Sequence, residues 1–387
     1  MISKLASNYA PLPVVITKGK DIFLWDIQGK KYVDLISGYS AVNQGHCHPS
    51  IVKKLVEQAS QLTLASRVVQ NDKLTEWSVM MTKTFHYDKV LPANGGSEAV
   101  ETSLKLARKY GREVCGLDRP FIICLRGNFH GRTIAATSLS DYEPYRTGFG
   151  PFLQDKITIQ MNNEVQLLRV FEDIGSSVAA ILYEPVQGEG GIVPMTPSFI
   201  DAFRTVKRTY PHVLLMADEI QCGLGRVGYM TASDMYGLKP DVLLLGKALS
   251  GGMLPMSCVL ANEKAMGVFT PGIHGSTFGG NPLASVVSME AVRVIQDECI
   301  PNVKKVSSMV ESLLRSLPSP VQHIRGAGLF WGIQFEPSYS IEDLRLRLLQ
   351  HGYITCTSRY NTLRLSPPLT ITKVELEKTI NTLSTCL

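Results

Sequence analysis

The sequence predicts an α/β protein, with a mainly parallel sheet in a large domain and a smaller α+β domain after it. Short apolar segments alternate with helical patterns from about residue 88 onward, which is typical of parallel strands covered by helices. After about residue 282 this pattern ends, and a long helix leads into a different α+β region. At 387 residues the chain is too long for one average domain.

The N-terminal part predicts strands followed by a helix. Residues 20–36 contain two short apolar segments around a turn at 28–30. A loop rich in Gly, Asn and His follows, and an amphipathic helix is expected at about 49–62. The expected division is 1–37 for an N-terminal segment that packs with the small domain, 38–282 for the large domain and 283–387 for the small domain.

Six apolar segments are the strand candidates of the large domain. Two stretches, 179–182 and 213–216, are apolar throughout, as expected for strands covered on both faces. Helical patterns at 98–111 and 197–209 lie between such segments. The six candidates are 89–92, 121–125, 179–184, 213–218, 242–245 and 257–261, and the C-terminal region adds a helix at about 282–298 and strands at 329–335 and 362–365.

The composition is that of an ordinary globular protein, with 44% hydrophobic and 19% charged residues. The net charge of +5 is mild and its charges are interspersed, which gives no support to nucleic-acid binding. The eight cysteines form no C-x-x-C pair and no secretory signal precedes them, so a reducing compartment is expected. No apolar stretch approaches the roughly 20 residues of a membrane helix. We therefore expect a cytoplasmic protein without a membrane partner.

Lys247 and Asp218 are the first candidates for a site, because Lys247 follows an apolar strand and Asp218 ends another. Ligands of open α/β sheets bind beyond the carboxyl ends of strands. A partly desolvated lysine there offers a neutral amine for Schiff-base chemistry, although a surface lysine at a strand end is the alternative. Asp218 could cap a loop, or it could pair with a protonated pyridine nitrogen. Together the two residues form the arrangement that pyridoxal chemistry needs.

Two small-residue loops could bind a phosphate. Gly96 and Ser97 lie between a short strand and a helix, where backbone N–H groups and the helix dipole favour an anion. The loop at 274–282 could contribute Ser276 or Thr277. Glycine-rich turns often only shape a loop, so this signal gains weight from Lys247.

Further candidates follow other strands. Phe129 could stack on a flat heterocycle and Arg132 could bind a carboxylate, although either could be a structural loop residue. Glu184 and Glu189 add carboxylates near the same edge of the sheet. The two histidines at 46 and 48 are expected to be packing residues, so no metal site is predicted.

In combination these motifs resemble the class III (ω-amino acid) aminotransferases, which depend on pyridoxal 5′-phosphate and have the fold-type I architecture. The resemblance covers nearly the whole chain, with the motifs in the family's order. They are NGGSEAVET at 94–102, GNFHGRT at 127–133, EPVQGEGG at 184–191, ADEIQCGLGRVG at 217–228, GKALSGG at 246–252 and HGSTFGGNP at 274–282.

The resemblance implies a cofactor site. Lys247 would hold the cofactor aldehyde and carry the proton during transamination, and Asp218 would pair with the ring nitrogen. Thr277 would come from the neighbouring subunit of a homodimer. The remaining roles are Gln221 on the phenolic oxygen, Phe129 on the ring face, His130 beside it, and Gly96 and Ser97 on the phosphate.

Within the class, YSAVNQGHCHP at 39–49 and LRLSPPL at 363–369 resemble the ornithine aminotransferases. That resemblance implies that amino acid and 2-oxo acid substrates are held by five residues. Tyr9 and Tyr39 would hold the α-amino end of ornithine, and Arg132 its α-carboxylate. Glu189 would mask Arg364 until 2-oxoglutarate binds.

The implied reaction is a ping-pong transfer of the δ-amino group of L-ornithine to 2-oxoglutarate, giving glutamate 5-semialdehyde and glutamate. His130 and the EGG at 189–191 are closer to acetylornithine aminotransferases, and many ornithine aminotransferases have tryptophan at the His130 position. Acetylornithine, lysine or 4-aminobutyrate therefore stay open as donors, whereas Tyr9 and Tyr39 favour free ornithine. Decarboxylase, racemase or mutase activity, which some class members have, and a non-catalytic pyridoxal-binding protein are the remaining alternatives.

Overall fold

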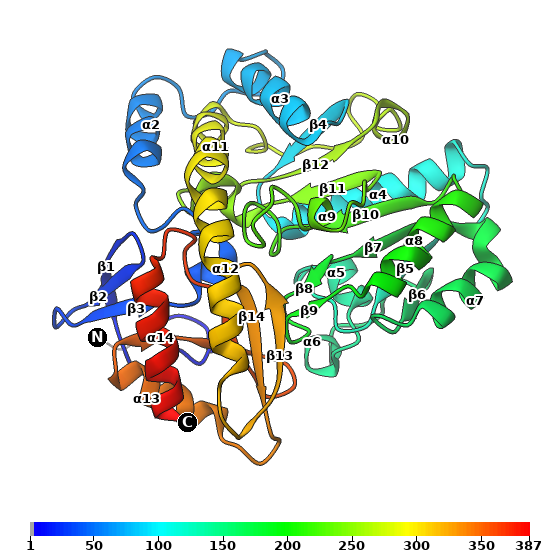
Figure 1. The fold of residues 1–387 in the computed structure, drawn as a ribbon. Helices are drawn as coiled ribbons and strands as arrows, with labels where there is room; N and C mark the ends of the chain where they lie inside the picture. Colours follow the sequence, from blue (N-terminus) through cyan, green and yellow to red (C-terminus); the bar gives the residue numbers. More distant parts are fainter. Residues whose placement is uncertain (1–3) are drawn as a thin grey trace.

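A computed structural model describes residues 4–387. Its centre is a seven-stranded sheet in the order β4-β12-β11-β10-β7-β5-β6 (Figure 1). All neighbours are parallel except those of β12, which runs antiparallel to both β11 and β4. The predicted mainly parallel sheet is therefore confirmed. Its strands are β4 (Lys89–Ala93), β5 (Phe121–Leu125), β6 (Lys156–Ile159), β7 (Val178–Tyr183), β10 (Leu214–Asp218), β11 (Val242–Leu245) and β12 (Ser257–Ala261).

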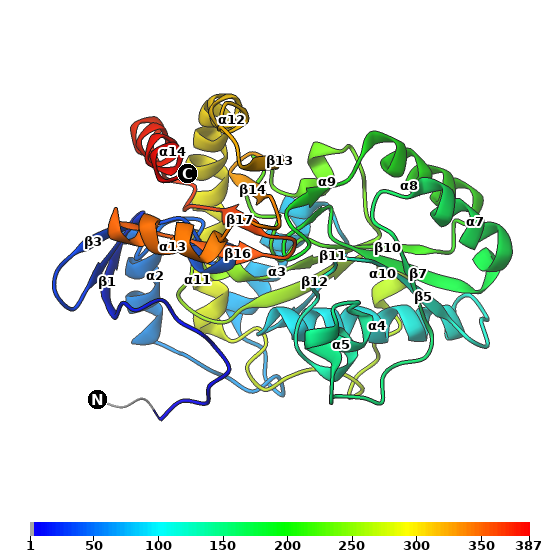
Figure 2. The same ribbon diagram turned by 90° about the horizontal axis from the view of Figure 1, so that it is seen from below.

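Helices cover both faces of this sheet (Figure 2). Successive strand residues point to opposite faces, so each strand contributes to two cores. In β10, Leu214 and Met216 belong to one core, whereas Leu215 and Ala217 belong to the other. The covering helices are α4 (Gly96–Glu113) and α5 (Ile134–Leu139) on one face, and α7 (Glu164–Ile174) and α8 (Pro197–Thr209) on the other.

The long helix after the large sheet extends beyond its predicted end at about residue 298. α11 (Pro282–Val294) passes through a π-helical turn at Ile295–Cys299 into α12 (Ile300–Arg315). The observed helix includes Pro301, although a proline in the interior usually breaks a helix. The π turn shifts the hydrogen bonds by one residue, and the chain accommodates the missing N–H of this proline in the first turn of α12.

The N-terminal strands pair with the C-terminal part of the chain (Figure 1). β3 runs parallel to β15, with Val33 opposite Tyr353. The turn before β3 is held by Asp26, whose Oδ1 accepts hydrogen bonds from the backbone N–H groups of Gln28 and Lys30 at 3.0 and 2.9 Å. This sheet consists of β1 (Ile16–Lys20), β2 (Phe23–Asp26), β3 (Lys31–Asp34) and β15 (Tyr353–Ile354).

A four-stranded antiparallel sheet in the order β13-β14-β17-β16 completes the C-terminal part. The strands of this sheet are β13 (Val321–Ala327), β14 (Phe330–Phe335), β16 (Cys356–Ser358) and β17 (Thr362–Leu365).

In residues 4–387, no helix has the length and apolar character needed to cross a membrane. The remaining elements are α1 (Ser37–Ser40), α2 (Pro49–Ala59), α3 (Asp72–Phe85), α6 (Glu143–Arg146), β8 (Val186–Gln187), β9 (Val193–Pro194), α9 (Ala232–Met235), α10 (Glu263–Met266), α13 (Ile341–Gln350), α14 (Lys373–Cys386) and short 3₁₀ turns at Gly175–Ser177 and Lys247–Ser250.

Arg226 is fully buried and connects three parts of the chain. Its Nη1 donates to the backbone carbonyls of Leu329 and Pro367 at 3.1 and 2.5 Å, and its Nη2 donates to Ser37 Oγ at 2.9 Å and to Asn43 Oδ1. Burial lowers the pKa of Arg226 to about 9. Burial removes water from the guanidinium, and the four acceptors offset this lost hydration.

We expect Arg226→Met to lower the free energy of unfolding by about 3 kcal/mol, because buried acceptors lose their charged donor. Urea denaturation would measure the change. Arg315→Met is the control, since the Arg315 side chain is 58% exposed and its loss should cost about 0.5 kcal/mol or less. Equal losses in the two variants would contradict this account of Arg226.

Candidate functional site

The site lies where the parallel strands of the large sheet end. β5, β7, β10 and β11 point the same way, so the residues that follow them meet at one edge. β4 also ends there and leads into the first turn of α4. A cavity of about 200 Å³ occupies this edge. It is lined by Gly96, Ser97, Phe129, His130, Gly131, Arg132, Glu184, Asp218, Ile220, Gln221 and Lys247.

Lys247 follows β11 and is held in an uncommon backbone conformation. Its φ is 47°, in the left-handed region that a residue with a side chain seldom adopts and that is enriched at functional sites. Burial lowers the pKa of Lys247 to about 8, against the opposing effect of the Asp218 charge. A large fraction of this amine is therefore neutral, and nucleophilic, at mildly alkaline pH.

Asp218 and His130 form a buried pair on the cavity wall. His130 Nδ1 lies 2.7 Å from Asp218 Oδ2, and the backbone N–H of Ile220 donates to Asp218 Oδ1 at 3.1 Å. Burial alone would lower the pKa of His130, but the hydrogen bond and the charge of Asp218 outweigh it and the pKa is raised. The pair fixes one carboxylate at the end of β10, as a partner for a cationic ring nitrogen requires.

Glu184 supports the loop that carries Phe129. Its carboxylate accepts hydrogen bonds from the backbone N–H groups of Phe129 at 2.9 Å and Gly188 at 3.2 Å. Burial raises the pKa of Glu184 to about 7, although the His130 charge opposes the rise. The sequence placed this carboxylate at the correct edge but did not reveal its contact with the loop.

The start of α4 forms an anion cradle. The N–H groups of Gly96 and Ser97 lie in the first turn, where a helix has no acceptors of its own. Gly131, with φ +125°, approaches so closely that a Cβ would lie 2.1 Å from Ser97 Oγ. Side chains are thus excluded between the cradle and the Phe129 loop. An amine, a carboxylate, an aromatic ring and this cradle around one cavity fit a flat heteroaromatic aldehyde with a phosphate arm.

Thr277 does not line this cavity and is exposed in its own chain. Its neighbour Ser276 accepts hydrogen bonds from Asn94 Nδ2 at 3.2 Å and from the N–H of Gly279 at 2.9 Å, which holds the loop beside the start of α4. The contribution of Thr277 to a neighbouring subunit's site stays a prediction.

Arg364 is fully buried beside the cavity and has four polar partners. Its Nη1 lies 2.8 Å from Gln221 Oε1 and 3.5 Å from Glu189 Oε1. Its Nε donates to Ser366 Oγ at 2.9 Å, and its Nη2 donates to Ser40 Oγ at 3.2 Å. The Glu189 contact is the longest of the four, so it is the partner that a competing carboxylate replaces most readily.

Gln221 lines the cavity while its carbonyl oxygen is held by Arg364. This contact leaves the NH₂ group of Gln221 as a donor for a ligand. The close approach depends on Gly188, where a Cβ would lie 2.2 Å from Gln221 Oε1.

Tyr39, Tyr9 and Arg132 are more exposed. Tyr39 lies next to Arg364, whose Cζ is 5.5 Å from the ring centroid. The pKa of Tyr39 is raised by burial first, then by Cys356 and Glu189, and Tyr9 also contributes. Tyr9 is 79% exposed but lies within electrostatic range of Tyr39. The structure thus groups the two tyrosines, and it places Arg132 on the cavity wall.

No group of three or more His, Cys, Asp or Glu residues suited to a metal ion occurs in residues 4–387. His46 pairs with Asp34 at 2.8 Å and His48 with Glu298 at 3.3 Å, so both histidines have packing partners.

Sequence reasoning missed several supporting residues. Ser40, Gly131 and Ser366 lie inside recognised motifs, whereas Tyr145 and Arg359 carry no motif signal.

Comparisons with known proteins agree with this geometry. The family model described as aminotransferase class III matches residues 4–387. Ornithine aminotransferase 1 of Staphylococcus aureus (strain COL) is 44% identical over 97% of this chain and 95% of its own length. The solved ornithine aminotransferase of Toxoplasma gondii ME49 has a TM-score of 0.95 at 37% identity, covering 99% of this chain and 92% of that one. The acetylornithine aminotransferase of Elizabethkingia anophelis has a TM-score of 0.87 at 40% identity, covering 98% and 95%.

We expect the rate at which a small amine-reactive electrophile modifies Lys247 in the cofactor-free protein to rise with pH around a midpoint of about 8, because burial favours the neutral form of Lys247. Mass spectrometry of the labelled peptide would measure the rate. The control is the same protein unfolded in urea, where the midpoint should return to about 10.4. A midpoint above 10 in the folded protein would contradict the depressed pKa.

Proposed function

This chain belongs to the class III aminotransferase family, and from that premise we propose that it transfers the δ-amino group of L-ornithine to 2-oxoglutarate. The products are glutamate 5-semialdehyde and glutamate, formed in two half-reactions of a ping-pong cycle. The enzyme depends on pyridoxal 5′-phosphate. The observation that carries the choice of substrates is the Glu189–Arg364 pair beside the cavity, together with Tyr39 and Tyr9.

The cofactor, when bound, supplies an electron sink next to the nitrogen that is transferred. The chain supplies its binding and the proton transfers. Lys247 would hold the cofactor aldehyde and would carry a proton on Nζ, which suits an amine with a pKa of about 8. Asp218, supported by His130, would pair with the protonated ring nitrogen. Gly96 and Ser97 would bind the phosphate, Gln221 the phenolic oxygen, and Phe129 the ring face.

Ornithine is oriented by its α-carbon end, so that its distal amine meets the cofactor. Arg132 on the cavity wall binds the α-carboxylate with its planar guanidinium. Tyr39 and Tyr9 lie on the side of Arg364 and hold the α-amino group. While Glu189 covers Arg364, the charge of that arginine is neutralised and a cationic diamine acid is accepted.

The second substrate reverses this charge balance. When the carboxylate of 2-oxoglutarate displaces Glu189, the side chain of Arg364 keeps its contacts with Gln221, Ser40 and Ser366. Glu189 can move outward, because its side chain is 17% exposed whereas that of Arg364 is 0% exposed. One ion pair therefore lets a single pocket accept a diamine acid and then a dianion.

N-Acetylornithine is the second candidate donor. It is favoured by His130 on the cavity wall and by the 40% identity to the Elizabethkingia anophelis enzyme. An acetylated nitrogen has less need of two tyrosine hydroxyls, and this difference places free ornithine first.

We also propose a cytoplasmic homodimer that completes its site with Thr277 of the second subunit. In support, Thr277 is exposed beside the start of α4, and all eight cysteines are free thiols. We propose the division into residues 1–37, 38–282 and 283–387, supported by the pairing of β3 with β15.

We expect L-ornithine to have the highest kcat/KM in a panel with N-acetylornithine, L-lysine and 4-aminobutyrate, read by glutamate formation from 2-oxoglutarate. Lys247→Ala should abolish turnover, because no other amine lines the cavity wall in the described residues. Lys239→Ala, at an exposed position, is the control. A higher kcat/KM for N-acetylornithine would replace the proposed donor, and normal turnover of Lys247→Ala would refute the mechanism.

We expect Glu189→Gln to raise the ratio of kcat/KM for L-glutamate to that for L-ornithine by about tenfold, or about 1.4 kcal/mol. The neutral amide leaves the charge of Arg364 open to α-carboxylates at all times. Single-turnover absorbance changes with each amino acid would give the two constants. Glu172→Gln, on the exposed side of α7, is the matched control. An unchanged ratio in Glu189→Gln would exclude Glu189 as the gate.

A further inference from the structure

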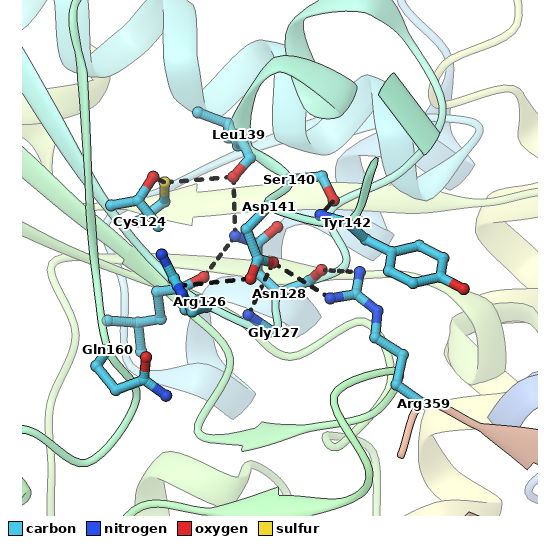
Figure 3. Close-up of polar contacts among 12 residues, drawn as sticks. Cys124, Arg126, Gly127, Asn128, Leu139, Ser140, Asp141, Tyr142, Gln160 and Arg359 are labelled. Atoms are coloured by element: carbon cyan, nitrogen blue, oxygen red, sulfur yellow. Dashed lines mark hydrogen bonds and ion pairs between the residues drawn. The ribbon is translucent and has the colours of Figure 1, made fainter. Parts of the chain in front are cut away.

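A buried arginine from the C-terminal sheet contacts the loop that follows β5 (Figure 3). Arg359 lies between β16 and β17, and its side chain is 7% exposed. Its Nη1 lies 3.2 Å from Asp141 Oδ1, and its Nη2 donates to the carbonyl of Asn128 at 3.3 Å. Asp141 also accepts from the backbone N–H of Gly127 at 3.0 Å. Arg359 and Asp141 thus hold the beginning of the loop that carries Arg132.

Two tyrosines connect this buried arginine to Arg132. The Cζ atom of Arg132 lies 3.8 Å from the ring centroid of Tyr145. Arg359 Cζ lies 5.5 Å from the same centroid and 4.3 Å from that of Tyr142. The two tyrosine rings pack edge to face, with centroids 4.7 Å apart and planes at 80°. Tyr145 is therefore shared by a buried guanidinium and an exposed one.

Arg132 is held mainly by aromatic rings. Its side chain is exposed, and within residues 4–387 it makes no ion pair with a carboxylate. The contacts that hold the guanidinium are the ring of Tyr145 and, at 5.2 Å, the ring of Phe129. A guanidinium stacked on a ring keeps its N–H groups at the edge, where they can bind a carboxylate with two parallel hydrogen bonds.

We infer that Tyr145, held in place by Arg359 and Asp141, is a positioning residue that presents Arg132 to the carboxylate of the amino donor. The inference rests on the proposed function, which assigns that carboxylate to Arg132. Ordering the long side chain before substrate arrives removes part of the entropy that binding would otherwise cost. Tyr145 thereby contributes to the preference for donors that carry a carboxylate.

Arg359 also has a second contact, through its backbone. Its N–H donates to the carbonyl of Glu189 at 3.2 Å, so the hairpin that carries Arg364 also holds the gate residue. A substitution at Arg359 keeps this backbone bond and removes only the guanidinium. The side-chain role can therefore be tested separately from the gate.

The test compares L-ornithine with 1,4-diaminobutane, which is the same molecule without the carboxylate. For each holoenzyme variant, single-turnover kinetics give kcat/KM for both donors, and their ratio isolates carboxylate recognition. We expect Tyr145→Leu and Arg359→Met to lower the ratio about fivefold, mainly through a higher KM for ornithine. Tyr145→Phe keeps the ring and should restore the ratio of the unchanged enzyme. Arg132→Met is the reference for complete loss.

The outcomes separate this inference from the proposed function. If Arg132→Met lowers the ratio and Tyr145→Leu and Arg359→Met do not, Tyr145 has no positioning role and the proposed function stands. If Arg132→Met leaves the ratio unchanged, the assignment of Arg132 fails and the inference fails with it. Thermal unfolding identifies a variant that does not fold. Asp141→Asn then replaces the variant that does not fold. It should also lower the ratio about fivefold, and an unchanged ratio would contradict the positioning role of Tyr145.

Discussion

The common direction of five strands is the constraint on which the site depends. Because β4, β5, β7, β10 and β11 all end at one edge, residues from 96 to 247 meet around one cavity. The alternation of side chains along each strand fills two apolar cores, one on each face of the sheet. The polar groups are then carried by the segments after the strands, where loops and helix starts tolerate them.

Burial of charge at this edge is stabilised by mutual contacts. Asp218 would be costly to bury alone, and His130 offsets that cost. The positive charge of Arg364 is surrounded by hydroxyl and amide oxygens and by one removable carboxylate. Lys247 has no such set of partners, and its depressed pKa is the result. Arg364 is thus held by polar partners on several sides, whereas burial without such partners leaves Lys247 a reactive amine.

The apolar strands could be predicted because a strand buried on both faces is a continuous apolar segment. The strands at 121–125, 242–245 and 257–261 were placed with the correct bounds for this reason. The continuation of the long helix through Pro301 could not be predicted, since a π turn has no sequence signature of its own. In the site, Lys247 was recognised from its strand and its motif. Tyr145 and Arg359 were not, because they lie far apart in the sequence and neither belongs to a periodic pattern.

The parallel pairing of β3 with β15 has a consequence for the order of folding. During synthesis β1, β2 and β3 emerge first, but the strand that completes their sheet is not made until residue 354. Contacts so distant in sequence form late, since the intervening chain must be ordered before they are closed. The large sheet, whose strands all lie between residues 89 and 261, has its full sequence earlier. A nascent chain therefore holds an unpaired β3 edge while its central sheet forms, and this is the stage at which a chaperone or a second nascent chain would find an exposed strand.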